Sequence, residues 1–241
     1  MQNTGFASTQ WSPVLAARDA TNPEGAAALA ALCGIYWPPL YAFVRRGGRQ
    51  PEDAQDLTQS FFAHLLERRG LLQAEQERGK LRSFLLASLK NFLVNQWDRD
   101  HAQKRGGGVE FLSLERLVGA ESNYSSDETV GLLSQEKVYE RTWALTLLER
   151  ATTRLSAEFQ GAGKAGQFEH LKVFLAGDGS GVSYAEIAPA VGMSEGAVRV
   201  AVHRLRNRFR SLLRDEIAQT LENPRDLNAI EDELRDLINA L

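Results

Sequence analysis

Arginine is the residue type most suited to a chemical role in this chain, because arginines are concentrated at regular spacing between Ser194 and Arg214. This stretch holds six arginines and one histidine against a single acid, Glu195. In a helix turning by about 100° per residue, four of these side chains share one side: Arg199, His203, Arg206 and Arg210. Guanidinium groups bind phosphate and guanine, so such a face suits a nucleic acid. The alternative is a surface helix whose arginines are merely solvated.

The elements that must position these side chains are two helices joined by a tight turn. Ser183 and Glu186 have the spacing of a capping box at the start of the first helix, and Gly192 stands where a left-handed residue would end it. Ser194 is suited to cap the second helix. That helix carries an apolar stripe at helical spacing: Val198, Val202, Leu205, Phe209 and Leu212. The pattern predicts a helix-turn-helix.

The stretch YAEIAPAVGMSEGAVRVAVHRLRNRFRSLL resembles the promoter-recognition helix-turn-helix of bacterial sigma factors, most closely the extracytoplasmic-function group. In that family the second helix enters the major groove of the upstream promoter element. The resemblance implies DNA contacts by nine residues: Ser194, Glu195, Gly196, Arg199, Val200, His203, Arg204, Arg206 and Arg210. Response regulators carry a similar motif. A DNA-binding regulator that does not enter the polymerase is therefore the alternative.

A second stretch, residues 51–69, begins with a proline and two acids, which favour a helix start. Its apolar spacing predicts a buried stripe along Leu57, Phe61 and Leu65. Within it, DAQDLTQSFF resembles the sigma-factor segment that docks on the clamp helices of the largest polymerase subunit. The resemblance implies polymerase contacts by three residues: Asp53, Asp56 and Gln59. The alternative is an ordinary amphipathic surface helix.

The same stretch departs from the family at Gln55 and Ser60, where related chains carry acids. This departure implies weaker binding to the clamp. Phosphorylation of Thr58 or Ser60 would add negative charge there, which makes a Ser/Thr kinase a candidate partner. An anti-sigma factor is a further candidate partner under the same resemblance.

A third stretch, residues 78–105, interleaves basic and amide side chains with a tryptophan. Between Lys80 and Arg105 it holds six basic residues and two acids, a pattern that suits single-stranded or partly melted DNA. LRSFLLASLKNFLVNQWDR resembles the sigma-factor helix that recognises and opens the downstream promoter element. The resemblance implies contacts by five residues: Lys90, Asn91, Asn95, Trp97 and Arg99. The alternative is a core tryptophan among solvated charges.

Composition sets limits on the remaining function classes. The 241 residues carry a net charge of −3, no apolar run of transmembrane length and almost no strand pattern, so we expect an all-α protein without a membrane span. The four histidines lack metal-ligand spacing, and neither a nucleophile motif nor a phosphate-binding glycine loop is present. The single cysteine, Cys33, fits a reducing compartment. We expect a cytoplasmic, non-enzymatic protein without cofactor or metal.

The three motifs follow one another in the family's order, which implies a two-domain sigma factor that binds core RNA polymerase and promoter DNA. We expect five segments: an N-terminal extension at 1–22, a region 2-like domain at 23–105, a linker at 106–136, a region 4-like domain at 137–214 and an acidic extension at 215–241. Pro38 and Pro39 are expected to end or kink the first helix. The extension holds eight acids. It is expected either to cap the domain or to mask its basic face. A protein-interaction module that binds no DNA is the third alternative.

Overall fold

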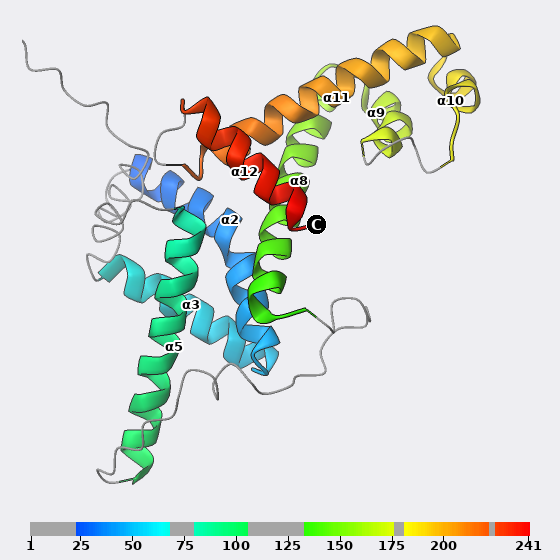
Figure 1. Ribbon diagram of the computed structural model, residues 1–241. Coiled ribbons are helices and arrows are strands. Elements are labelled where there is room, and N and C mark those ends of the chain that lie inside the picture. The colour runs from blue at the N-terminus through cyan, green and yellow to red at the C-terminus, as the bar shows by residue number, and fades with distance from the viewer. Residues whose placement is uncertain (1–22, 68–79, 106–132, 176–180, 222–224) are drawn as a thin grey trace, which may run out of the picture. The chain divides into compact units, whose positions relative to one another are not determined.

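The computed structural model describes residues 23–67, 80–105, 133–175, 181–221 and 225–241, and these residues form helices without any strand (Figure 1). The all-α prediction is confirmed for them. The expected N-terminal extension and most of the expected linker lie outside the described residues. Within the described ranges, no helix combines the length and apolar character needed to cross a membrane.

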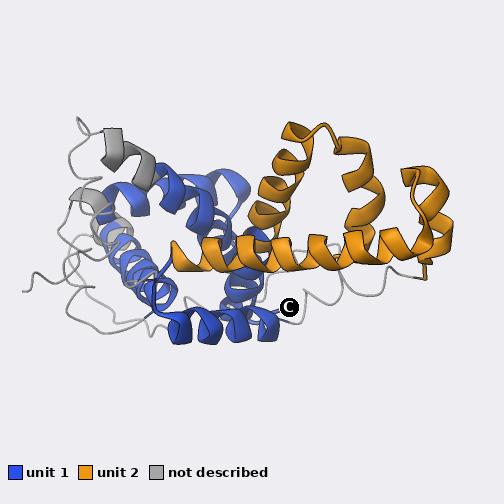
Figure 2. Cartoon of the chain, turned by 90° about the horizontal axis from the view of Figure 1, so that it is seen from above, with its two compact units in different colours: residues 1–146, 220–241 blue, residues 147–219 orange. Residues whose placement is uncertain are grey.

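The chain divides into two compact units (Figure 2). Unit 1 comprises Met1–Thr146 and Thr220–Leu241, and unit 2 comprises Leu147–Gln219. Both limits of unit 2 differ from the expected region 4-like domain. Helix α8 (Gln135–Gly161) contributes its first part to unit 1. Of the expected acidic extension, residues 215–219 belong to unit 2, and residues 220–241 belong to unit 1.

Among its described residues, unit 1 contains the first part of α8 and four complete helices: α2 (Pro23–Arg46), α3 (Pro51–Glu67), α5 (Leu81–Arg105) and α12 (Leu227–Asn239). These helices pack around an aromatic core. Phe61 of α3 makes edge-on contacts with Phe62 and with Phe92 of α5, at ring-centroid distances of 5.9 and 5.8 Å. Leu40 of α2 and Trp143 of α8 are fully buried in the same unit.

Helix α2 does not end at its two prolines, contrary to one of the two expected outcomes. It continues through Pro38 and Pro39 to Arg46. An interior proline costs a helix about 3 kcal/mol. Buried residues on both sides of the pair, Tyr36 before it and Leu40 and Phe43 after it, hold the helix in the core and offset that cost.

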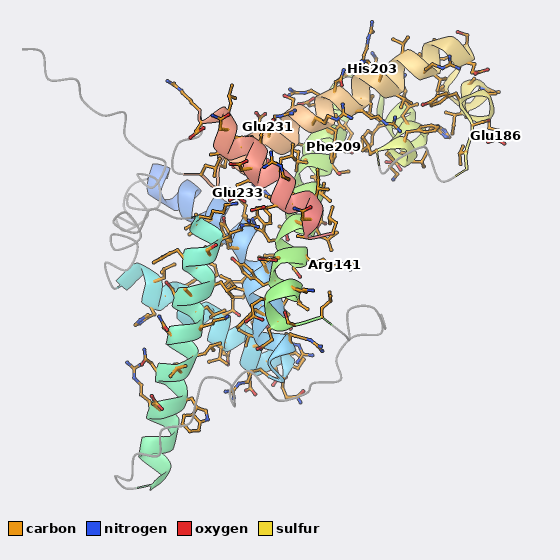
Figure 3. The ribbon with its side chains drawn as sticks, in the orientation of Figure 1. Arg141, Glu186, His203, Phe209, Glu231 and Glu233 are labelled. Atoms are coloured by element: carbon orange, nitrogen blue, oxygen red, sulfur yellow. The ribbon has the colours of Figure 1, made fainter. Side chains whose placement is uncertain are left out.

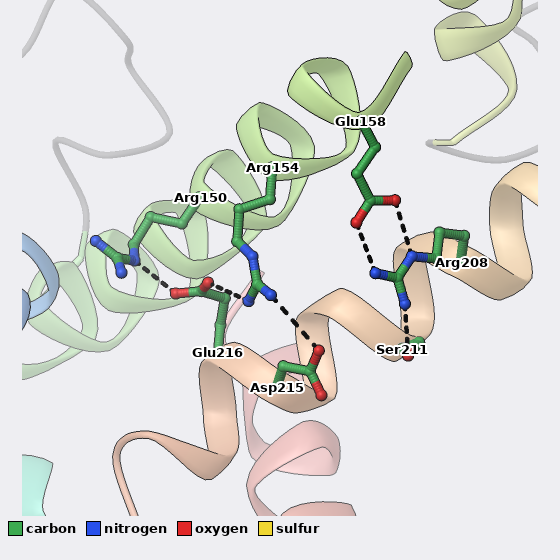
Figure 4. Close-up of polar contacts among 7 residues, drawn as sticks. All are labelled: Arg150, Arg154, Glu158, Arg208, Ser211, Asp215 and Glu216. Carbon is green, nitrogen blue, oxygen red and sulfur yellow. Dashed lines mark hydrogen bonds and ion pairs between the residues drawn. The ribbon is translucent and has the colours of Figure 1, made fainter. Parts of the chain in front are cut away.

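Unit 2 contains the rest of α8, α9 (Ala165–Leu171), the 3-10 turn η1 (Lys172–Phe174), α10 (Tyr184–Val191) and α11 (Glu195–Ala218). Helices α8 and α11 run antiparallel and are joined by ion pairs (Figure 4). The carboxylate of Glu216 is almost fully buried and accepts hydrogen bonds from Arg150 at 2.6 Å and Arg154 at 2.8 Å. These contacts fix the C-terminal half of α11 and leave its N-terminal half to carry the helix-turn-helix.

Candidate nucleic-acid interface

The turn between α10 and α11 has the predicted geometry. Ser183 and Glu186 form the capping box, with the Ser183 backbone N–H donating to Glu186 Oε2 at 2.8 Å and the Glu186 N–H donating to Ser183 Oγ at 3.2 Å. Gly192 ends α10 in the left-handed region at φ 64°, which favours glycine. Ser194 then caps α11 by accepting a hydrogen bond from the N–H of Ala197. The turn is therefore determined locally on both sides.

Helix α11 buries the predicted apolar face and exposes the predicted basic face. Val198, Val202 and Leu205 are at most 2% exposed, whereas Phe209 is only half-buried. Eight of the nine predicted DNA contacts are exposed, and Arg206 is half-buried; the exposed ones are Ser194, Glu195, Gly196, Arg199, Val200, His203, Arg204 and Arg210. An added Cβ at Gly196 would meet no atom within 4 Å. The first turn therefore leaves room for a partner to approach the backbone.

Short contacts along the helix arrange the exposed polar side chains. Arg199 lies 3.2 Å from the Glu195 carboxylate, and its guanidinium is 5.8 Å from the ring centre of Tyr184. His203, marked in Figure 3, lies 3.0 Å from the amide nitrogen of Asn207. Asn207 is exposed on the same side. It is not among the contacts predicted from the sequence, although its position four residues after His203 places it on the same face of the helix. An amide there can read adenine.

Arg206 departs from the expectation that it projects outward. Its side chain is half-buried, and its Nε donates a 2.9 Å hydrogen bond to the backbone carbonyl of Phe174. That carbonyl belongs to the 3-10 turn η1, whose end needs a donor. Arg206 therefore braces unit 2 internally, and a major-groove contact would have to compete with this bond.

Arg204, the ninth predicted contact, is exposed on a different flank of α11. It lines a groove of about 380 Å³ whose apolar residues include Phe159, Met193 and Leu205. Arg208 lies on the same flank and forms a two-bonded ion pair with Glu158 at 2.6 and 2.9 Å (Figure 4). The Arg208 hydrogen bonds hold the pKa of Glu158 below its usual 4.5. The arginines of α11 thus divide between two surfaces.

The candidate downstream-element residues on α5 differ in exposure. Asn91, Asn95 and Arg99 are exposed, and Arg99 donates a hydrogen bond to Gln96 Oε1 at 3.2 Å. Trp97 is half-buried. Its exposure is therefore intermediate between that of a ring open for base stacking and that of a core residue. The exposed amides and Arg99 keep the polar face that single-stranded DNA would contact.

Lys90 is drawn into the protein itself. Its Nζ forms a 2.6 Å ion pair with Glu136 of α8 and lies 5.7 Å from the ring centre of Phe43. This hydrogen bond lowers the pKa of Glu136. Lys80 and Arg82, at the start of the same basic stretch, pair with acids of α12. Three cations of this stretch therefore have internal acidic partners.

The three candidate polymerase contacts lie together on the outer surface of α3. Asp53, Asp56 and Gln59 are all exposed. Phe61 and Leu65 of the predicted stripe are buried, whereas Leu57 is only half-buried. Ala54 and Thr58 are fully buried as well and widen the packed face. Small side chains at these two positions allow α3 to pack closely in the core.

Thr58 is not available for the phosphorylation considered above. Its side chain is fully buried, and Oγ1 donates a 2.7 Å hydrogen bond to the Ala54 carbonyl. A phosphate there would require α3 to leave the core. Ser60 is exposed, so of the two hydroxyl residues considered it is the one that a kinase could reach.

The described surfaces therefore offer three polar faces: the outer side of α11 in unit 2, and the outer sides of α5 and α3 in unit 1.

Among the described residues, no group of three or more His, Cys, Asp or Glu side chains is arranged to hold a metal ion. Comparison of the chain with protein-family models, with curated proteins and with solved structures finds no match.

Proposed function

We propose that this protein is a sigma factor of the extracytoplasmic-function type, which binds bacterial RNA polymerase core and directs it to promoters. The observation that carries the proposal is the capped helix-turn-helix of unit 2, whose recognition helix presents a basic face to solvent. Arg199, His203 and Arg210 would contact base edges and phosphates of the upstream element. Gly196 would allow the backbone to approach the DNA closely.

The exposed side of α3 supports the polymerase-binding part of the proposal. Asp53, Asp56 and Gln59 form a polar surface on a helix whose opposite face is firmly packed. Because this segment resembles the clamp-binding segment of sigma factors, we propose the clamp of the polymerase as the partner of that surface. Asn91, Asn95 and Arg99 of α5 would contact the downstream element once the strands separate.

A DNA-binding regulator that does not enter the polymerase is the second candidate. The pairing of Lys80, Arg82 and Lys90 with acids favours it, because it reduces the positive charge that unit 1 offers to DNA. Under this alternative only unit 2 binds nucleic acid. Co-purification with core polymerase separates the two functions, since the regulator does not require it.

Run-off transcription with core polymerase on a library of promoter sequences tests the proposal. We expect the chain to produce discrete transcripts whose templates share an upstream and a downstream element. Arg199→Ala should lose these transcripts, whereas Lys172→Ala, a surface change on the 3-10 turn, should retain them. A chain that neither binds core polymerase nor starts transcription is not a sigma factor.

A further inference from the structure

The acidic helix α12 docks inside unit 1 on the first turn of α5. Glu233, marked in Figure 3, lies between two cations, with Oε1 3.2 Å from Lys80 Nζ and Oε2 3.3 Å from Arg82 Nε. Asp236 pairs with both of the same cations through Oδ2. Two carboxylates of α12 thus neutralise the two cations at the start of α5.

Arg82 is also held by residues of unit 1 outside α12. The Arg82 guanidinium lies over the indole of Trp143, 4.5 Å from the ring centre, and the Tyr139 hydroxyl donates to the Arg82 carbonyl at 2.9 Å. Trp143 and Tyr139 are fully buried. The Lys80 side chain is more than a third exposed. An anion that replaced α12 would meet an Arg82 guanidinium that already lies over Trp143.

Helix α12 is held by a narrow contact. Of its thirteen residues, three are buried: Ile230, Glu233 and Leu237. Leu227 and Ile238 are exposed, so much of its apolar surface contributes nothing to docking. Among the described residues, no hydrogen bond reaches the buried Glu233 Oε2. Because buried ion pairs gain little over their hydrated, separated forms, exchange of this helix for another anion is feasible.

We propose that α12 is a built-in competitor of nucleic-acid phosphate at the start of α5, an inference that rests on the proposed DNA-binding role of that helix. Carboxylate and phosphate are both anions that Lys and Arg bind near a helix N-terminus. While Glu233 and Asp236 occupy the site, α5 binds DNA through its remaining polar residues. When α12 leaves, Lys80 and Arg82 add two phosphate contacts. In this proposal α12 acts on α5, the candidate downstream-element helix.

The test neutralises the two carboxylates without changing their shape. Glu233→Gln/Asp236→Asn is prepared in the full chain, and binding to a labelled mixed-sequence single strand of about 20 nucleotides is measured across a salt series. Two added phosphate contacts should steepen the dependence of log K on log salt by about 1.4. The affinity advantage of the variant should then shrink about sevenfold between roughly 50 and 200 mM salt.

The matched control is Glu231→Gln/Asp232→Asn, which removes the same charge from exposed positions of the same helix. It should leave the salt dependence as in the wild type. Adding Lys80→Ala to Glu233→Gln/Asp236→Asn should remove about half of the gained slope, because each contact contributes about 0.7 for a single strand. If both double variants gain the same DNA affinity and salt slope, the effect comes from the overall charge of the chain, and the proposal is overturned.

Folding is checked by circular dichroism and melting for every variant. If Glu233→Gln/Asp236→Asn loses its cooperative melting, the milder Asp236→Asn decides, since this carboxylate is more than a third exposed. A folded Asp236→Asn chain with unchanged DNA affinity contradicts competition. If the Asp236→Asn chain with unchanged DNA affinity still supports transcription, competition is excluded but the proposed sigma function is retained. Tighter DNA binding without core-polymerase binding preserves competition and removes the sigma function.

Discussion

Arginines that are equivalent by spacing have different surroundings on α11. Arg199 is two-thirds exposed beside Glu195, whereas Arg206 is half-buried and bonded to the Phe174 carbonyl. An exposed guanidinium is available to a guanine, and one bonded to a carbonyl stabilises the fold. We therefore propose recognition for Arg199 and a stabilising role for Arg206.

Substitution by alanine should separate these two roles. Arg199→Ala should reduce discrimination between the specific promoter and random duplex by about 1–3 kcal/mol and leave the melting temperature unchanged. Arg206→Ala should lower the melting temperature, because the Phe174 carbonyl loses its donor. Competition binding and thermal melting of both variants provide the measurements. Equal melting temperatures for the two variants would contradict the bracing role of Arg206.

At the scale of elements, α3 separates an exposed polar face, the proposed polymerase contact, from a buried packing face. Asp56→Ala and Gln59→Ala should weaken binding to core polymerase and preserve helix content, because both side chains are exposed. Glu140→Ala, at an exposed position of α8 in the same unit, is the control. Phe61→Ala should instead destabilise unit 1 by about 3–5 kcal/mol, because Phe61 is fully buried. Core affinities equal to wild type in both polar variants would disprove the clamp contact.

The docking of α12 should respond to acid. The Lys80 hydrogen bond, followed by the charges of Lys80 and Arg82, holds the pKa of Asp236 below its usual 3.8. A carboxyl whose pKa is lowered by folding adds stability above its unfolded pKa and loses it as the pH falls through the folded pKa. Asp236→Asn should therefore melt below wild type at about pH 7 and converge with it near about pH 2.

The exposed Asp232 provides the control for this pH series. It pairs with Arg235 of the same helix, and both side chains are well exposed. Asp232→Asn should change the melting temperature less than Asp236→Asn does at about pH 7, since surface pairs contribute little. A constant difference between wild type and Asp236→Asn over the whole pH range would show that the ion pairs do not stabilise the docking.

At the scale of the whole molecule, a net charge of −3 conceals a strong segregation of charge. DNA binding should nevertheless weaken steeply with salt, because the basic face of α11 acts locally. Arg210→Ala should lower the salt slope for duplex DNA by about 0.9. Lys172→Ala removes the same charge from η1, where Lys172 pairs with Glu169, and should not change the slope. Equal slopes for all three proteins would exclude Arg210 from phosphate binding.

The helix-turn-helix could be read from the sequence because its causes are local. The capping box of Ser183 and Glu186, the left-handed Gly192 and the cap at Ser194 each involve residues within a few positions of one another. The apolar period of α11 and the exposure of Arg199 and His203 follow from the same helical geometry. The all-α class follows similarly from periodicity along the chain.

Only the tertiary structure decided which charged residues are available. Lys80 meets Asp236, 156 positions later, and Lys90 meets Glu136, 46 positions later. Periodicity states which face of a helix is apolar, but not which other helix will cover it, so neither pairing was predictable. The same holds for the Phe174 carbonyl that Arg206 contacts and for the assignment of α12 to unit 1. Partners distant in sequence are chosen by packing, because burial is a property of the assembled core and not of any single segment.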